Sequence, residues 1–183
     1  MSKMAETEHI EYLHSCIRNV PDFPKPGIQF KDITPLLHDV KARGLVVDLM
    51  TKEFANQNIN VVAAIEARGF LFGMMLAERL NVPFVPIRKS GKLPFRKRSA
   101  TYNLEYGTAT IEIHDDAIEK NARVLIHDDV LATGGTAAAA ATLVSEMGGT
   151  LAGFSFIINL TFLGGASNLM QQFGVQQYSL LSY

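Results

Sequence analysis

The stretch 124–141 constrains this chain most, because a short apolar run there gives way to two acids, a small polar turn and a run of alanines. Val124 to Ile126 read as a buried strand, since a strand covered on both faces shows a continuous apolar run. Ala137 to Ala141 are strong helix formers. The order strand, polar loop, helix predicts an open α/β sheet, in which ligands bind outside the carboxyl ends of the strands.

The polar loop of this stretch suits a phosphate group and sugar hydroxyls. Its glycines let backbone amides approach an oxyanion closely, and its threonine hydroxyls can donate to the remaining oxygens. It lacks the lysine that follows the last glycine of a nucleoside triphosphate loop. Asp128 and Asp129 would repel phosphate, so they suit ribose hydroxyls, or a Mg²⁺ ion held directly or through water. The alternative is an ordinary strand-to-helix turn with an acid pair near the helix start.

Residues 124–136, Val-Leu-Ile-His-Asp-Asp-Val-Leu-Ala-Thr-Gly-Gly-Thr, resemble the phosphoribosyl pyrophosphate (PRPP) signature of the type I phosphoribosyltransferases. The resemblance implies an α/β fold with a central, mainly parallel sheet flanked by helices, a small N-terminal hood and a flexible lid. The signature does not specify the acceptor base. It implies that these residues bind PRPP: Asp128, Asp129, Ala132, Thr133, Gly134, Gly135 and Thr136.

Length and composition favour one globular domain over residues 1–183. A chain of 183 residues can bury a proper core but is short for two domains. The net charge of -1 argues against broad affinity for nucleic acids or membrane surfaces. Cys16 is the single cysteine, so it excludes an internal disulfide and fits a reducing cytoplasm. We expect no signal peptide, no membrane span and a cytoplasmic location.

The proline-rich segment 21–35 follows an expected helix over 7–19 and carries two phenylalanines. It suits a ligand-binding loop, or a hydrophobic arm that packs on the core or on a partner subunit. Residues 21–37 resemble the base-binding segment of the adenine phosphoribosyltransferase family, so residues 1–35 would form the N-terminal helix and hood. By that similarity Phe30 stacks on the purine with Val130 on its other face, while backbone groups of Gln29 and Lys31 read its edge.

A second strand, loop and helix unit is expected over 59–80, with its loop at 66–68. Arg68 lies at the helix start, where the helix dipole disfavours a cation. It is therefore expected to face a bound anion, the alternative being a surface arginine. Residues 66–73 resemble the pyrophosphate loop of the same family, which implies a catalytic role for Arg68 and a cis peptide bond between Glu66 and Ala67.

A strand over 83–87 is followed by a basic loop over 88–98 with six lysines and arginines. Residues 87–94 resemble a family motif, which implies that Arg88, Lys89 and Lys92 contact pyrophosphate. Residues 88–108 would form the mobile lid that excludes water from the reacting sugar. The cations at 96–98 fit a solvated loop equally well. Glu105 matches the family's lid and becomes the candidate general acid or base, the alternative being an ordinary hairpin glutamate.

The remaining pattern predicts helices over 38–54 and 164–173, and strands over 109–114, 150–160 and 176–181. The five histidines show no metal-ligand spacing.

The resemblance implies the reaction of adenine with PRPP to give AMP and pyrophosphate, with Mg²⁺ as cofactor, in a homodimer without nucleic-acid or membrane partners. Two alternatives stay open. One is a transferase of the same superfamily that acts on hypoxanthine, guanine, xanthine or orotate. The other is a PRPP-sensing regulator that binds without turnover.

Overall fold

The computed structural model describes the backbone of residues 3–103 and 107–183 and divides the chain into two compact units, residues 1–49 and 50–183. The N-terminal unit carries the proline-rich segment, and the C-terminal unit carries the stretch 124–141. Among the described residues, no helix is both long and apolar enough to cross a membrane.

The N-terminal unit contains a short antiparallel hairpin that the sequence did not predict. Its strands pair with Val20 opposite Phe30, and Pro21 ends the first strand, where its missing N–H costs the ladder little. The first helix ends at Ser15, earlier than expected. The elements are α1 (Lys3–Ser15), β1 (Arg18–Pro21), β2 (Gln29–Asp32), α2 (Thr34–His38) and α3 (Val40–Phe54), which continues into the second unit.

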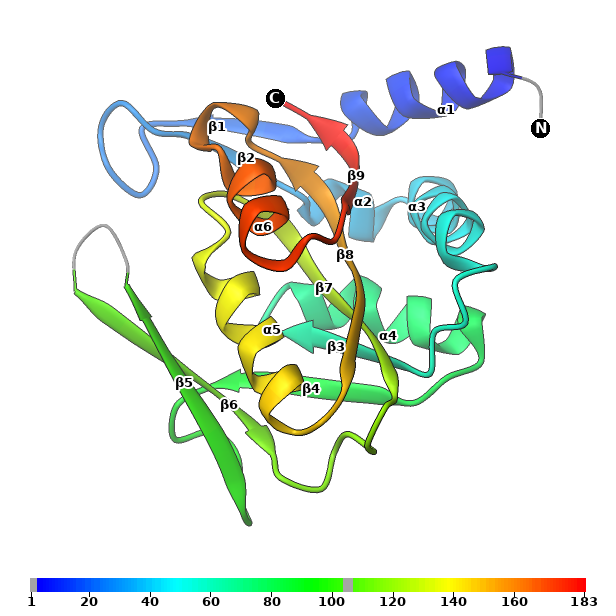
Figure 1. Cartoon of the computed structure of the whole chain (residues 1–183). Helices are drawn as coiled ribbons and strands as arrows, with labels where there is room; N and C mark the ends of the chain where they lie inside the picture. The colour runs from blue at the N-terminus through cyan, green and yellow to red at the C-terminus, as the bar shows by residue number, and fades with distance from the viewer. Residues whose placement is uncertain (1–2, 104–106) are drawn as a thin grey trace. The chain divides into compact units, whose positions relative to one another are not determined.

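The described part of the C-terminal unit is built on a seven-stranded sheet with the order β5-β6-β4-β3-β7-β8-β9 (Figure 1). Strands β4, β3, β7, β8 and β9 are parallel, whereas β5 and β6 form an antiparallel hairpin at one edge. The predicted α/β fold with a central, mainly parallel sheet is thus confirmed. The strands are β3 (Val61–Ile65), β4 (Phe84–Lys89), β5 (Lys97–Asn103), β6 (Thr108–His114), β7 (Arg123–Leu131), β8 (Thr150–Asn159) and β9 (Gln177–Ser182).

Helices cover both faces of this sheet. The connection β3-α4-β4 runs toward one edge and β7-α5-β8 runs toward the other, so right-handed crossovers place α4 (Gly69–Leu80) and α5 (Gly135–Glu146) on opposite faces (Figure 1). The main core cluster lies on the α5 side and includes Val124, Ile126, Ala140 and Val144. A short 3-10 turn (Thr161–Leu163) and α6 (Gly165–Phe173) connect β8 to β9.

The chain order makes the border of β3 and β7 a topological switch point. The two strands are neighbours, with Ala64 opposite His127, yet the helices that follow them leave to opposite faces. A crevice opens between the carboxyl ends of two such strands, and ligands of open α/β sheets bind there. Both loops that were singled out from the sequence begin at this place.

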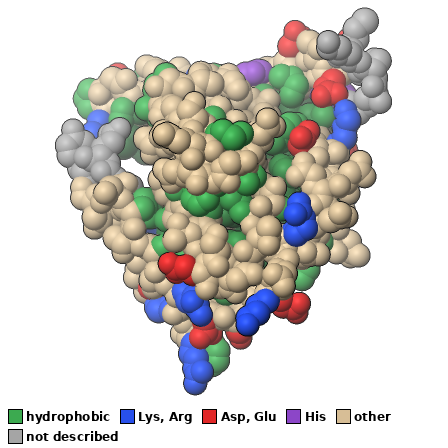
Figure 2. Space-filling model, viewed as in Figure 1, with side chains coloured by type: hydrophobic (Ala, Val, Ile, Leu, Met, Phe, Trp, Pro, Cys, Tyr) green, Lys and Arg blue, Asp and Glu red, His purple; other side chains and the backbone are tan. Residues whose placement is uncertain are grey.

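Several strand boundaries differ from the expected ones, and those of β7, β4 and β5 bear on the site. Strand β7 continues to Leu131, so the acid pair lies within the strand instead of in the loop. The basic region is less of a loop than predicted, because Arg88 and Lys89 end β4 while Lys97 and Arg98 begin β5. Backbone pairing with β6 extends both strands beyond their apolar residues. In Figure 2, basic and acidic side chains gather at the lower end of the view, where Figure 1 shows this hairpin.

Candidate functional site

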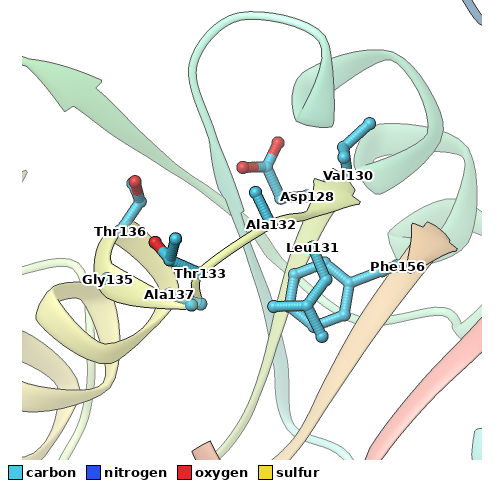
Figure 3. A pocket seen from close by; sticks show the side chains of 10 residues that line it. Asp128, Val130, Leu131, Ala132, Thr133, Gly135, Thr136, Ala137 and Phe156 are labelled. Carbon is cyan, nitrogen blue, oxygen red and sulfur yellow. The ribbon is translucent and has the colours of Figure 1, made fainter. Parts of the chain in front are cut away.

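A small open pocket of about 70 Å³ lies at the carboxyl end of β7 and the start of α5 (Figure 3). The carboxylate of Asp128 and the hydroxyls of Thr133 and Thr136 are its polar side-chain groups, as the close-up shows. The predicted phosphate loop therefore surrounds a real concavity. The pocket is lined by Asp128, Val130, Leu131, Ala132, Thr133, Gly134, Gly135, Thr136, Ala137 and Phe156.

The loop owes its shape to Gly134, whose backbone φ of 86° is rarely adopted by residues that carry a side chain. Its carbonyl oxygen accepts from the N–H of Ala138 at 2.8 Å, and that of Thr133 accepts from Asn168 Nδ2 of α6 at 3.1 Å. The N–H groups of the first turn of α5 have no acceptor within the helix. Together with the helix dipole, these amides make the pocket suitable for an anion.

Helix α6 supports the same loop from behind. A Cβ atom added to Gly165 would collide with the carbonyl oxygen of Ala132, and one added to Gly134 would lie 3.1 Å from the carbonyl oxygen of Gly165. Only glycine at position 165 allows this close approach. Nothing in the sequence pattern marked α6 as part of the site, because the contact joins segments that are far apart in the chain.

The acid pair lies next to the pocket, with Asp129 almost completely buried. The N–H of Asp129 donates to Asp128 Oδ1 at 2.8 Å. Burial raises the pKa of the Asp128 carboxyl well above its usual range, and the neighbouring charge of Asp129 raises it further. Burial also raises the pKa of Asp129, while the guanidinium of Arg68 opposes that shift. Among the described residues, a guanidinium acts on both carboxyls and opposes the rise of their pKa values.

Arg68 supplies that cation from the other loop. Its Nε lies 2.7 Å from Asp129 Oδ2, and its side chain remains 41% exposed. The structure therefore brings together Arg68 and the acid pair, which the sequence had placed in separate motifs. The guanidinium can keep this ion pair and still present N–H groups to a ligand, because it carries five donors.

Two glycines bring α4 close to the strands that carry these groups. A Cβ atom on Gly69 would lie 2.8 Å from Asp128 Oδ1 and 3.1 Å from its Cα. One on Gly73 would lie 2.6 Å from Cβ of Ala64. Both positions face the sheet because they are one helical turn apart. The beginning of α4, and with it Arg68, can approach the acid pair only because both side chains are absent.

The loop after β3 also carries Glu66, which the sequence reasoning did not select. The peptide bond between Glu66 and Ala67 is cis, as the resemblance implied. The carboxylate of Glu66 forms a two-point ion pair with Arg88, and both N–O distances are 3.2 Å. Lys89 and Lys92 have exposed side chains on the same segment. Of the three predicted pyrophosphate contacts, Arg88 thus already has a carboxylate partner.

A second carboxylate, Glu112 of β6, fixes the basic segment. It is buried and accepts from Ser90 Oγ at 2.8 Å, from the N–H of Gly91 at 3.0 Å and from Lys97 Nζ at 2.8 Å. Lys97 and Ser90 hold the pKa of the Glu112 carboxyl below its usual value. Arg98 Nη1 donates to the carbonyl oxygen of Glu146 at 3.3 Å. Lys97 and Arg98 therefore make structural contacts, which a solvated loop would lack.

The residues predicted to bind the base lie in both units. Gln29, Phe30 and Lys31 belong to β2 of the N-terminal unit, and Val130 belongs to β7 of the C-terminal unit. The Gln29 side chain accepts from Asn19 Nδ2 at 2.8 Å, and the ring of Phe30 is partly buried. Glu105, the predicted general acid or base, lies outside the described residues.

Comparison with known proteins gives consistent matches. The model of the phosphoribosyl transferase domain matches residues 37–175. An adenine phosphoribosyltransferase of Sorangium cellulosum is 53% identical over 92% of this chain and 84% of its own length. The structure of an adenine phosphoribosyltransferase from Thermoanaerobacter pseudethanolicus superimposes with a TM-score of 0.91 at 48% identity, covering 95% of this chain and 99% of that one.

A third relative has been solved with ligands. It is the adenine phosphoribosyltransferase of Saccharomyces cerevisiae in complex with adenine and an imino-altritol bisphosphate. Its TM-score is 0.89 at 37% identity, and the match covers 96% of this chain and 99% of that one.

Proposed function

The chain belongs to the adenine phosphoribosyltransferase family, and we propose on this basis that it transfers the 5-phosphoribosyl group from PRPP to adenine, giving AMP and pyrophosphate. The enzyme is a pentosyltransferase of purine salvage. The observation that carries the assignment is the switch point of β3 and β7, where an anion-binding turn and a cationic loop share one buried acid pair. PRPP carries a 5-phosphate, ribose hydroxyls and a pyrophosphate in that order, and these groups match the anion-binding turn, the acid pair and the cationic loop.

We assign the sugar 5-phosphate to the turn before α5, where backbone amides and two threonine hydroxyls can surround its oxygens. Asp128 and Asp129 would then accept hydrogen bonds from the ribose hydroxyls. The residues proposed for this half of PRPP are Asp128, Asp129, Ala132, Thr133, Gly134, Gly135 and Thr136.

The leaving pyrophosphate is proposed to face Arg68, Lys89 and Lys92. Arg88 lies next to Lys89 at the carboxyl end of β4. The bond from C1 to pyrophosphate breaks while the sugar becomes oxocarbenium-like, so negative charge grows on the leaving group. Fixed donors aimed at that charge stabilise the transition state by on the order of 3 kcal/mol each. Arg68 suits this role because its ion pair with Asp129 fixes its orientation before the substrate binds.

Mg²⁺ is the proposed cofactor. This ion usually keeps several waters and is bound by one or two carboxylates together with substrate phosphates. The acid pair fits such a site by its position, since Asp128 lines the pocket and Asp129 lies beside it as the ion-pair partner of Arg68. When bound, Mg²⁺ would neutralise pyrophosphate oxygens, with Asp128 and Asp129 as partners through water.

The base-binding residues are proposed from the family resemblance: Phe30 and Val130 for the two faces of the purine, and backbone groups of Gln29 and Lys31 for its edge. Glu105 would exchange a proton with the purine. In this proposal the N-terminal residues 1–35 and the lid 88–108 work as parts of one catalytic domain over residues 1–183. Support comes from the resemblance of both segments to the family and from relatives that match nearly the whole chain.

We further propose a cytoplasmic homodimer without nucleic-acid or membrane partners. The outer face of α4 supports self-association, because Leu71 and Met74 are 44% and 52% exposed one helical turn apart. The lone cysteine, Cys16, fits a reducing compartment.

The test supplies PRPP and Mg²⁺ with adenine, hypoxanthine, guanine, xanthine or orotate in separate reactions and omits Mg²⁺ as a control. We expect AMP with adenine only, and only when Mg²⁺ is present. Product from another base would overturn the base assignment and leave the phosphate half standing. Binding of PRPP without any product would replace the enzyme by a PRPP-sensing regulator.

A further inference from the structure

We infer that Glu66 is a positioning residue that acts through Arg88 to hold the loop after β3 and the loop after β4 at a fixed separation. The inference rests on the proposed function in one respect, namely that both loops face the pyrophosphate of PRPP. It assigns a task to Glu66 and gives Arg88 a role other than direct contact with substrate.

The register of the sheet brings the two residues together. Strands β3 and β4 are parallel neighbours with Ile65 opposite Ile87, so Glu66, the first residue after β3, comes beside Arg88 of β4. The N–H of Glu66 donates to the carbonyl oxygen of Ile87 at 2.9 Å, which anchors its backbone. Its carboxylate also accepts from the N–H of Lys89 at 3.0 Å. Glu66 is thus bound to β4 through both backbone and side chain.

Arg88 extends this connection to the basic loop. Its Nε and Nη2 donate to the two oxygens of Glu66, and its Nη1 donates to the carbonyl oxygen of Lys92 at 3.0 Å. All three guanidinium nitrogens therefore donate within the protein. A planar fork is needed for this, because the ammonium of a lysine is a point charge and cannot bridge such acceptors in a fixed geometry.

The charges show which cations remain for the substrate. The guanidinium of Arg88 holds the pKa of the Glu66 carboxyl below its usual value, so the pair is ionic at neutral pH and its net charge is zero. Lys89 and Lys92 have exposed side chains and bond to the bridge through backbone groups, and Arg68 follows two residues after Glu66. The bridge sets the spacing between Arg68 and the two lysines before pyrophosphate is present.

Such preorganisation favours the transition state, because cations already in place need not move as charge develops on the leaving group. Without Glu66, Arg88 would become a loose cation beside the site, and the loop at 89–92 would lose its tie to β3. We expect Glu66→Gln to lower kcat/KM for PRPP by about tenfold or more, with kcat lowered as well, while KM for adenine stays within about twofold.

The experiment is a double-mutant cycle of Glu66→Gln, Arg88→Gln and the double variant. Its readouts are kcat and KM for PRPP, KM for adenine, calorimetric binding of Mg²⁺-pyrophosphate, and the melting temperature. Glu53→Gln, an exposed carboxylate of α3, is the matched control. If Glu66 acts through Arg88, the double variant is no worse than the poorer single variant. Arg88→Lys, which keeps the charge and loses the fork, should behave like Arg88→Gln.

Fully additive losses, or a Glu66→Gln enzyme with wild-type kinetics, would overturn the inference. Should Glu66→Gln fail to fold, the same cycle is run with Glu66→Asp and Arg88→Lys, and additivity again decides. A wild-type protein that makes no AMP refutes the proposed function instead. In that case pyrophosphate binding still tests the bridge, since unchanged binding in both single variants contradicts it.

Discussion

At the scale of single residues, the ion pair of Arg68 and Asp129 explains two unfavourable features at once. An arginine at a helix start opposes the helix dipole, and a buried aspartate is costly unless its charge is matched. Each residue offsets the other across 2.7 Å. The pairing also leaves 41% of the Arg68 side chain exposed, which a ligand contact requires.

Arg68→Ala is therefore expected to lower turnover by about a hundredfold or more without unfolding the protein. The substitution removes a fixed donor and leaves Asp129 without its cation, so the carboxyl is expected to protonate more readily. Steady-state kinetics and a melting curve check this. Arg79→Ala, at the exposed end of the same helix, is the control. Near-normal turnover of the Arg68 variant would refute its role.

At the scale of elements, the packing of α4 on β7 and β3 decides where Arg68 stands. The contact uses Gly69 and Gly73, at which any side chain would meet neighbouring atoms at 2.8 Å or less. At Gly73 the nearest atom is the Cβ of Ala64, which cannot turn away, and at Gly69 the backbone Cα of Asp128 lies 3.1 Å from the added atom. A shift of α4 that made room for a side chain would therefore also move Arg68 relative to the acid pair.

Gly69→Ala should destabilise the fold by roughly 1–3 kcal/mol, as overpacking usually does, and should weaken PRPP binding in addition. Gly44→Ala is the matched control, because Gly44 lies inside α3 with open space around it. That change should stabilise by about 0.5–1 kcal/mol through helix propensity. Urea unfolding measures both. Equal effects of the two substitutions would contradict the close packing.

The outer face of α4 gives a second prediction at this scale. Replacing Leu71 and Met74 by glutamate places two charges on the proposed self-association surface, so the double variant should be monomeric where the wild type is dimeric. Light scattering at working concentration decides the mass. Met170→Glu changes an apolar residue of similar exposure on α6 and should leave the mass unchanged. A wild-type monomer would remove the dimer from the proposal.

At the scale of the whole molecule, buried titratable groups govern stability against acid. The pKa values of Glu66 and Glu112 are lowered by their cationic partners, so their contribution is complete above about pH 4.5 and is lost below it. Burial lowers the pKa of His127 to about 3. Its unfolded form takes up a proton near pH 6.5, so stability begins to fall at a higher pH than the carboxylates alone would cause.

We expect His127→Gln to remove that early part of the acid transition. Between pH 6.5 and 4.5 the wild type should lose up to about 1.4 kcal/mol per pH unit relative to the variant. The raised pKa of Asp128 acts in the opposite direction, and the comparison cancels it because both proteins contain the residue. Urea unfolding as a function of pH gives the two curves. Parallel curves over this interval would show that His127 is not held neutral.

Local signals in the sequence predicted much of this architecture. Apolar runs indicated strands β3 and β8, and a run of alanines indicated helix α5. Glycines and threonines indicated the turn at 132–136. The hairpin β1-β2 was missed because each strand has only four residues in a proline-rich context. The burial of Glu112 could not be predicted, since its partners come from the loop and β5, and its neighbours in sequence suggested an exposed side.

The same reason explains what the sequence left open in the site. Arg68 and Asp129 are paired by the adjacency of β3 and β7, and Glu66 meets Arg88 by the adjacency of β3 and β4. Neither neighbour relation is visible in a local pattern. The motif residues stay predictions as ligand-binding groups, while their mutual contacts depend on the order of the strands. The role of Glu105 stays a prediction.

The glycines that face Ala132 and Asp128 have a consequence for mutational surveys. An alanine scan is designed to find sites by deleting atoms, yet at Gly165 and Gly69 the same scan inserts a methyl group where none fits. These positions will score as severe although they contribute no side chain to any ligand. A map of sensitive positions in this chain will thus combine residues that touch substrate with glycines at which no side chain fits. Substitution to serine or alanine alone will not distinguish the two kinds of position.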